Sequence, residues 1–333
     1  MTATLSVPGG STTARGSMRT ALVEGPAEAR IAERALREPG RGEVRIAVRG
    51  CGVCASSLPV WEGRPWFAYP LEPGAPGHEG WGVVDAVGDD VESVAVGARV
   101  ACLTQRAFAS HDYAAANEIV ELRGVPDGTP FPGEAFGCAM NIARASRIRP
   151  GDVVAVIGIG FLGAVLVRLA SEAGARVLAI SRRRWSLELA MTLGAAEAIP
   201  LDDHARVVDR VRSLRPDGVD ISIEATGAQW PLDLAAEITR EEGRLVIAGY
   251  HQDGARTVNL QHWNWRAFDI VNAHRRDPRA YIGGMRRAVD AVATGTLDPR
   301  QFITHSLRLG ELSTAFALLR ERPDGFLKAV VVP

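Results

Sequence analysis

The sequence predicts an α/β protein built from two units, a β-rich unit and a doubly wound parallel sheet with helices on both faces. Three observations support this class. The chain has 333 residues, more than one compact core usually holds, so two domains are expected. Short β-rich runs separated by Pro and Gly clusters extend from Met18 to about Arg123. Beyond residue 134, short apolar runs alternate with longer helical stretches.

The β-rich unit is predicted from four runs, which are MRTALV at 18–23, EVRIAVRG at 43–50, GWGVVDAVG at 80–88 and ARVACL at 98–103. Each is rich in Val, Ile or Leu and is bounded by turn residues. Residues 1–17 contain Gly, Ser, Thr and Pro but no apolar segment, so they are expected to be a flexible leader rather than an export signal.

The second unit follows a strand and helix rhythm. Strands are expected at 152–158, 176–182, 220–226 and 244–250, and helices at 162–174, 186–195, 204–215 and 232–243. A helical pattern at 278–295 then precedes ITHSLRL at 303–309, a helix at 311–322 and a closing strand at 326–332. These last elements are expected to return to the first unit.

Composition limits the partners that the chain can have. Lys and Arg number 38 against 39 Asp and Glu, so no charge excess favours nucleic acid or a membrane surface. The longest apolar run, at 153–167, is too short for a membrane span and contains three glycines. A small-molecule ligand is therefore expected. The four cysteines, in a chain without an export signal, indicate reduced thiols and a cytoplasmic location.

A glycine motif lies directly after a predicted strand and before a predicted helix. Gly158, Gly160 and Gly163 form the pattern G-x-G-x-x-G. The first glycine permits a tight turn, the second lets the backbone approach a pyrophosphate, and the third allows close packing of helix and strand. The helix N-terminus favours the phosphate charge. The motif predicts a dinucleotide site.

The end of the next strand predicts which dinucleotide is bound. An NAD-specific site carries Asp or Glu there, about 20 residues beyond the glycines, and that acid repels a 2′-phosphate. This chain has Ser181, followed by Arg182, Arg183 and Arg184. The pattern favours NADP over NAD, although an arginine run at a strand end can also be merely solvated. The cofactor-binding candidates are Gly158, Gly160, Phe161, Leu162, Gly163, Ser181, Arg182, Arg183 and Thr226.

Several motifs, taken in order, resemble a known family. These are CGVCASS at 51–57, GHEGWGVVDAVG at 77–88, EAFGCAMN at 134–141, RPGDVVAVIGIGFLG at 149–163, DISIEATG at 220–227 and ITHSLRL at 303–309. From Met18 onward the chain resembles the zinc-type alcohol and polyol dehydrogenases of the medium-chain dehydrogenase/reductase family. The resemblance implies a GroES-like catalytic domain over 18–140 and 276–333, interrupted by a Rossmann NAD(P)-binding domain over 141–275. It also implies a homodimer or homotetramer.

The resemblance implies one catalytic zinc in the cleft between the domains. The implied ligands are Cys54, His78, Glu79 and Cys138, with Glu134 as the alternative to Cys138. Glu134 and Cys138 are four residues apart and would share a helix face. Ser56 matches the family's proton-handling hydroxyl, and the catalytic candidates are Ser56, Cys54, His78 and Glu79. Taken singly, a cysteine or a histidine can equally be a packing residue.

Three departures from the family pattern affect the metal site. Ser57 replaces the acid that usually orients the zinc-bound histidine, and Pro59 replaces a histidine that relays protons in some members. The four-cysteine structural zinc lobe does not follow GARVACLTQ, so at most one zinc per chain is expected. Cys51 and Cys102 are then interpreted as packing residues, with Cys51 as a spare ligand.

The leading hypothesis is a zinc-dependent, NAD(P)-linked oxidoreductase that interconverts an alcohol and a ketone or aldehyde, with a preference for NADP. One alternative is a zinc-free NADPH-dependent reductase of the same fold that acts on an activated C=C or C=N bond. The other is a non-catalytic NAD(P)-binding sensor. Metal analysis separates the first two, and turnover separates both from the third.

Overall fold

A computed structural model describes residues 16–333 of the chain. The predicted leader at 1–17 lies almost entirely outside the described residues, and the first strand begins at Ser17. Among the helices of the described part, none has the length and apolar character needed to cross a bilayer.

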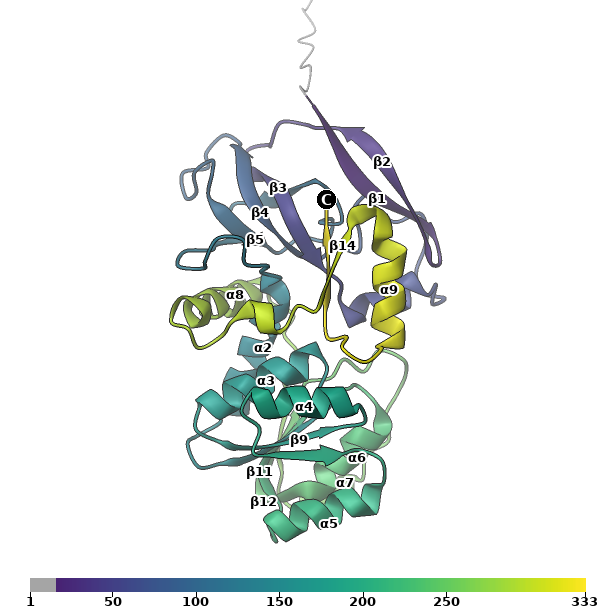
Figure 1. The fold of residues 1–333 in the computed structure, drawn as a ribbon, viewed down its shortest axis with the longest axis vertical. Helices are drawn as coiled ribbons and strands as arrows, with labels where there is room; N and C mark the ends of the chain where they lie inside the picture. The colour runs from purple at the N-terminus through teal and green to yellow at the C-terminus, as the bar shows by residue number, and fades with distance from the viewer. Residues whose placement is uncertain (1–15) are drawn as a thin grey trace, which may run out of the picture.

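The first and last parts of the chain form the β-rich unit (Figure 1). An antiparallel hairpin is made by β1 (Ser17–Gly25) and β2 (Glu28–Ala35). The main sheet contains β3 (Glu43–Gly52), β4 (Glu79–Val87), β5 (Arg99–Cys102), β6 (His111–Ala115), β7 (Ile119–Glu121), β14 (His305–Arg308) and β15 (Ala329–Val332). Its order is β14-β15-β3-β4-β5-β7, with β6 paired to β3. The C-terminal elements therefore return to the first unit, as expected.

The middle of the chain forms a six-stranded parallel sheet. Its strands are β8 (Val153–Ile157), β9 (Arg176–Ser181), β10 (Glu197–Pro200), β11 (Val219–Glu224), β12 (Thr239–Ile247) and β13 (Asp269–Asn272). The order is β10-β9-β8-β11-β12-β13, so the chain reverses its winding direction between β8 and β11. Ligands of such sheets bind at the carboxyl ends of the strands beside this switch point. The predicted α/β class with a doubly wound sheet is confirmed.

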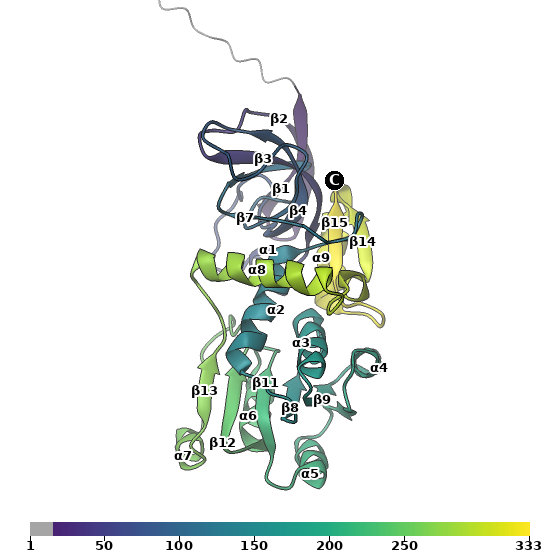
Figure 2. The same cartoon turned by 90° about the vertical axis from the view of Figure 1, so that its left-hand side faces the viewer.

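Nine α-helices occur within residues 16–333: α1 (Leu58–Trp61), α2 (Gly133–Ser146), α3 (Phe161–Glu172), α4 (Arg184–Thr192), α5 (His204–Leu214), α6 (Gln229–Ile238), α7 (Leu260–Trp265), α8 (Pro278–Ala293) and α9 (Leu312–Glu321). Three 3₁₀ turns complete the set: η1 (Ala55–Ser57), η2 (Pro299–Gln301) and η3 (Leu309–Glu311). Figure 2 shows α8 crossing α2 at the junction of the two units.

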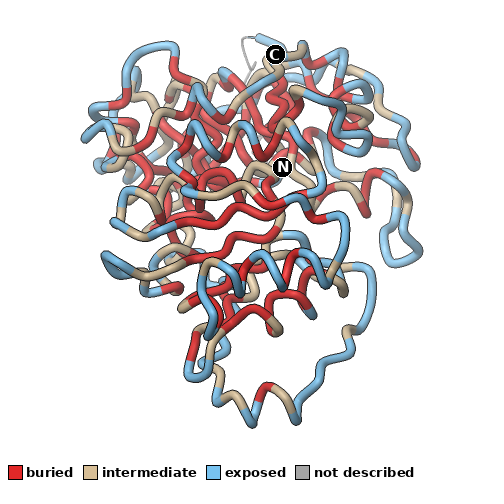
Figure 3. The backbone as a smooth tube through the Cα atoms, turned by 60° about the horizontal axis from the view of Figure 1, so that its bottom comes forward, coloured by how far each residue is buried: buried red, intermediate tan, exposed pale blue. Residues whose placement is uncertain are grey.

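The sequence pattern explains why helices cover both faces of the parallel sheet. Successive side chains of a strand point to opposite faces. Val154 and Val156 of β8 belong to one core cluster with α2 and α3, whereas Ala155 and Ile157 belong to another with α5 and α6. A strand buried on both faces must be apolar throughout, as β8 is. Figure 3 shows buried chain concentrated in the interior of the molecule and exposed chain at the periphery.

One predicted boundary was wrong. The helix expected at 232–243 ends at Ile238, and Thr239 already begins β12. Thr239 is fully buried, and its hydroxyl lies 2.7 Å from Ser222 Oγ of β11 and 2.6 Å from Ala235 O. Tertiary pairing of β12 with β11 thus decided a boundary at which the local pattern still favoured helix.

Candidate functional site

The glycine turn has the geometry that its sequence predicts. Gly158 follows β8 with φ 95°, a left-handed conformation that favours glycine. A Cβ on Gly158 would lie 2.3 Å from Thr226 Cγ2, and a Cβ on Gly163 would lie 2.0 Å from Gly158 O. Thr226 therefore packs directly against the turn. Both glycines are required by close packing around the start of α3.

The middle glycine faces open space. A Cβ on Gly160 would meet no other atom within 4 Å, and Gly160 is the N-cap residue of α3. This is where the unpaired N–H groups of a helix attract an anion. The Phe161 and Leu162 side chains pack against the core, so their backbone N–H groups are the parts available to a phosphate. The turn fits a dinucleotide pyrophosphate.

The predicted phosphate-binding arginines lie at the end of β9. Arg182 is exposed, and its side chain has no hydrogen-bond partner among residues 16–333. Arg183 donates from Nη1 to Phe326 O at 2.8 Å and to Arg322 O at 3.4 Å, which ties it to the chain before β15. Burial is the main cause that lowers the pKa of Arg322, and the charge of Arg182 lowers it further. Arg322 therefore also lies in this basic region. Ser181 is buried, and its Oγ accepts from Arg183 N at 3.4 Å.

A second cluster forms where β4 begins. The ligand atoms of Cys54, His78 and Glu79 all lie within 4.8 Å of one another. Cys54 precedes η1 and Glu79 is the first residue of β4, so the register of β4 against β3 brings the two segments together. Ser56 Oγ lies 3.2 Å from Cys54 Sγ and 3.5 Å from His78 Nε2. The structure thus brings all four predicted catalytic residues together.

A backbone carbonyl orients His78. Its Nδ1 lies 3.1 Å from Pro76 O, which suits an Nδ1–H donor and turns Nε2 toward Ser56 and Cys54. Within the described residues Ser57 makes no hydrogen bond to the imidazole, and its Oγ lies 3.5 Å from the same carbonyl. The role of the missing acid is therefore taken here by Pro76 O.

Negative charge accumulates around His78. Burial by itself lowers its pKa, but the hydrogen bond with Cys54 and the charges of Cys54, Glu134 and Glu79 raise it to about 10. Cys138 Sγ donates to Glu134 Oε1 at 3.2 Å, so the two alternative ligands are neighbours on α2. The group within 4.8 Å holds one imidazole, one thiol and one carboxylate, a donor set that suits zinc, but it includes neither the predicted fourth ligand Cys138 nor its alternative Glu134.

Lys328 is a site residue that sequence reasoning missed. Its Nζ lies 2.6 Å and 2.5 Å from the two oxygens of Glu79, and both side chains are buried. The same Nζ lies 4.8 Å from the centre of the Phe161 ring, at the start of α3. Lys328 therefore links the Cys54–His78–Glu79 cluster to the glycine turn. A signal existed, because Lys328 is the only lysine in the sequence and stands in an apolar run.

The sequence matches two family profiles that together span more than half of the chain. They are the alcohol dehydrogenase GroES-like domain, over residues 40–147, and the zinc-binding dehydrogenase family, over residues 162–291. The chain is 26% identical over 324 residues to 2-dehydro-3-deoxy-L-galactonate 5-dehydrogenase of Pseudoalteromonas atlantica, covering 88% of this chain and 92% of the relative. It is 27% identical over 323 residues to D-arabinitol dehydrogenase 1 of Uromyces fabae, covering 87% and 90%. A Sinorhizobium meliloti structure bound to NADP shares the fold, with a TM-score of 0.81, 22% identity and coverage of 96% and 100%.

Proposed function

Because the chain belongs to the medium-chain dehydrogenase/reductase family, with the zinc-type alcohol and polyol dehydrogenases as its relatives, we propose that it is a zinc-dependent, NADP-preferring oxidoreductase interconverting an alcohol and a carbonyl compound. Family membership makes it an NAD(P)-dependent oxidoreductase that acts on CH–OH groups. Zinc dependence and NADP preference are the parts proposed here. The Cys54–His78–Glu79 cluster beside the glycine turn supports zinc dependence, and Ser181 with the exposed Arg182 at the end of β9 supports NADP preference.

The residues at the cluster fit one zinc ion. Cys54 and His78 would hold it, together with Glu79 and either Cys138 or Glu134. Bound zinc supplies Lewis-acid polarisation of the substrate oxygen, and the nicotinamide supplies the hydride chemistry. Four closely spaced cysteines are absent from the sequence, so we propose a single zinc per chain.

The chain's own residues would perform the other tasks. Ser56 Oγ, between Cys54 Sγ and His78 Nε2, would exchange the hydroxyl proton of the substrate. The N–H groups at the start of α3 would bind the pyrophosphate. Lys328 would neutralise the buried charge of Glu79 while the cofactor binds at the adjacent glycine turn. A substrate with several hydroxyl groups is proposed, since arabinitol and a sugar acid occur in the names of the relatives.

Metal content and turnover of Cys54→Ala test this proposal, with Cys102→Ala as the matched control. Cys102 is a buried free cysteine that contacts Gly80 O and Thr104 rather than the cluster. Wild type and Cys102→Ala should each hold about one zinc and oxidise NADPH with a panel of ketoses and ketones. Cys54→Ala should lose both the zinc and at least about a hundredfold of kcat, since removal of a ligand disables the centre.

Two results would contradict the zinc proposal. Two zinc ions per wild-type chain would show that a structural site survives. Wild-type protein that is metal-free and unchanged in turnover after zinc addition would support the zinc-free reductase instead.

A further inference from the structure

Two adjoining cavities lie where the C-terminal half of α2 meets β13 and the start of α8. Their volumes are about 310 and 370 Å³, and both are lined by Arg144 and Arg275. No Asp or Glu is among the lining residues of either cavity. Six arginines line the pair: Arg144, Arg147, Arg244, Arg275, Arg279 and Arg287. We call this the arginine pocket.

Most of this positive charge is not balanced by the protein. Arg244 pairs with Asp269, and Arg279 pairs with Asp277 at 2.9 Å. The other four arginines have no acidic partner within residues 16–333: Arg144, Arg147, Arg275 and Arg287. Some arginines elsewhere pair with acids, as Arg30 does with Glu24, and others such as Arg182 do not. The pocket is distinguished by the convergence of six arginines around shared cavities.

Arg287 shows that the pocket is built into the packing. Its Nη2 donates to Asn141 Oδ1 at 2.6 Å, while its Nε is buried without a hydrogen-bond partner in the described part of the chain. Burial lowers the pKa of Arg287, and the charge of Arg144 lowers it further. Like charges are thus held close together, and an anion between them would relieve the repulsion.

None of the residues that line the arginine pocket belongs to the candidate active site. At the crossing of α2 and α8, a Cβ on Gly284 would lie 2.4 Å from Gly137 O, and Asn141 Nδ2 donates to Ala280 O at 3.0 Å. Glu134 and Cys138 lie on the N-terminal side of this crossing and Arg144 lies beyond it. The glycine turn follows β8, whereas the pocket lies at the β13 edge of the sheet.

We propose that the arginine pocket binds a small molecule that carries two or more phosphate or carboxylate groups. The guanidinium fork binds such oxyanions through two parallel hydrogen bonds, and several forks around one space suit a multiply charged ligand. The combined space is in the range of small-molecule sites. This site is additional to the proposed dehydrogenase site and does not depend on the reaction performed there.

Calorimetric titration with pyrophosphate and with tricarballylate tests the pocket. The protein is saturated with NADP⁺ so that the glycine turn is occupied, ionic strength is held constant, and metal content is measured before and after. The variants are Arg144→Gln and Arg275→Gln, both exposed and without side-chain hydrogen bonds in the described residues. Arg286→Gln is the matched control, because Arg286 is also exposed on α8 but lines neither cavity.

Wild type and Arg286→Gln should bind at least one probe with dissociation constants within twofold of each other. Arg144→Gln and Arg275→Gln should each weaken that binding about tenfold or more, as expected for loss of a charged hydrogen bond. Tighter binding of pyrophosphate would identify a phosphorylated ligand, and tighter binding of tricarballylate a polycarboxylate. No binding by wild type, or an equal loss in Arg286→Gln, would overturn the proposal. Both measurements are made without turnover, so they stand apart from the proposed activity.

Discussion

At the scale of single residues, the buried ion pair of Glu79 and Lys328 joins two segments that are 249 positions apart in the chain. Both charges are removed from water, which is costly unless each compensates the other. The pair is also packed tightly, since a Cβ on Gly52 would lie 1.8 Å from Glu79 Oε2. The local structure of the cluster therefore depends on the last strand of the protein.

Lys328→Met tests this dependence. It should lower the free energy of unfolding by about 3–5 kcal/mol, because Glu79 would be left buried without compensation. The double variant Glu79→Gln/Lys328→Met removes both charges and should be more stable than the single variant. Urea denaturation of wild type, Lys328→Met, Glu79→Gln and the double variant measures this. A double variant as unstable as the sum of the two single changes would show that the ion pair is not the cause.

The proposed preference for NADP also rests on single residues. Arg182 is exposed and unpartnered in the described chain, whereas Arg183 is engaged with Phe326 O, so Arg182 is the first candidate for the 2′-phosphate. Arg182→Ala should lower kcat/KM for NADPH about tenfold to a hundredfold, since a charged hydrogen bond contributes about 1.5–3 kcal/mol.

The control for Arg182 is Arg184→Ala, because Arg184 is exposed but pairs with Glu188 at 2.9 Å. This variant should leave kcat/KM for NADPH within about twofold of wild type, and NADH use should change little in either variant. Wild-type protein that uses NADH as well as or better than NADPH would refute the assignment.

At the scale of elements, the crossing of α2 and α8 is set by glycines. A Cβ on Gly284 would lie 2.4 Å from Gly137 O, whereas a Cβ on Gly283 would meet only Arg287 Nη1 at 3.5 Å. The two glycines are adjacent on one helix, but only Gly284 faces the crossing. The crossing holds α2, which carries Glu134 and Cys138, in position.

The pair Gly284→Ala and Gly283→Ala should therefore have opposite effects. Gly284→Ala should lower the free energy of unfolding by about 1–3 kcal/mol, because the helices must separate. Gly283→Ala should be neutral or stabilise by up to about 1 kcal/mol, because alanine is the better helix former. Thermal unfolding of both variants checks the prediction. Equal destabilisation would mean that the helices do not pack as closely as described.

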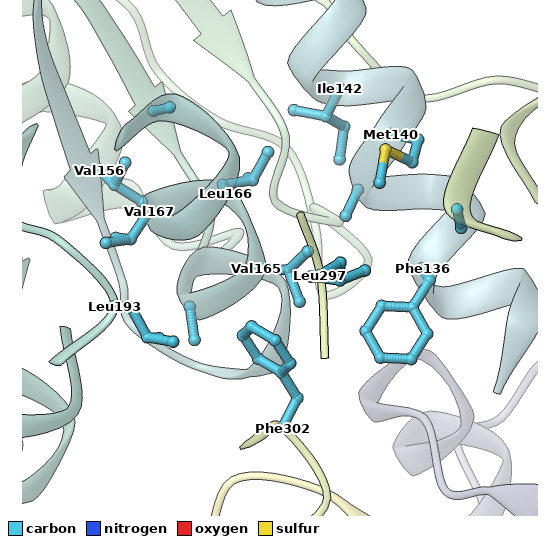
Figure 4. Packing of buried hydrophobic residues seen from close by; sticks show 14 of the residues in the cluster. Phe136, Met140, Ile142, Val156, Val165, Leu166, Val167, Leu193, Leu297 and Phe302 are labelled. Carbon is cyan, nitrogen blue, oxygen red and sulfur yellow. The ribbon is translucent and has the colours of Figure 1, made fainter. Parts of the chain in front are cut away.

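At the scale of the whole molecule, the two units share one hydrophobic core. A single cluster includes Trp81 and Ala101 of the β-rich unit and Val154 of the parallel sheet. Phe136 of α2 belongs to the same cluster, with its ring centre 5.2 Å from that of Phe161 and 6.0 Å from that of Phe302. Figure 4 shows Phe136 and Phe302 packed with Val165 and Leu297 of this cluster. Shared packing of this kind couples the unfolding of two units.

Phe302→Ala should weaken this junction. Phe302 is fully buried, so its truncation should cost about 3–5 kcal/mol and lower the melting temperature. Wild type should unfold in one calorimetric transition. Phe302→Ala should unfold at a lower temperature, in a broader transition or in two separate transitions. Trp265→Ala, at a side chain that is 82% exposed, serves as the control and should change little. An unchanged melting temperature for Phe302→Ala would contradict a shared core.

The sequence by itself determined the features that depend on local order. The alternation of strands and helices predicted the doubly wound sheet, and the spacing of Gly158, Gly160 and Gly163 predicted a turn whose left-handed φ and close contacts the structure shows. Periodicity and turn chemistry act over a few residues, so they can be read without knowing the fold. The resemblance of ordered motifs indicated the family and the candidate residues Cys54, His78 and Glu79.

Only the tertiary structure decided which distant groups meet. Helix α6 ends at Ile238 because of tertiary pairing, and the imidazole of His78 is hydrogen-bonded to Pro76 O rather than to Ser57. Lys328 forms an ion pair with Glu79. The tertiary structure also gathered arginines from α2, β12 and α8 around shared cavities. The physical reason is the same in each case. These contacts join segments through burial and pairing across the fold, and no local pattern in the chain encodes which partner a buried charge or carbonyl will find.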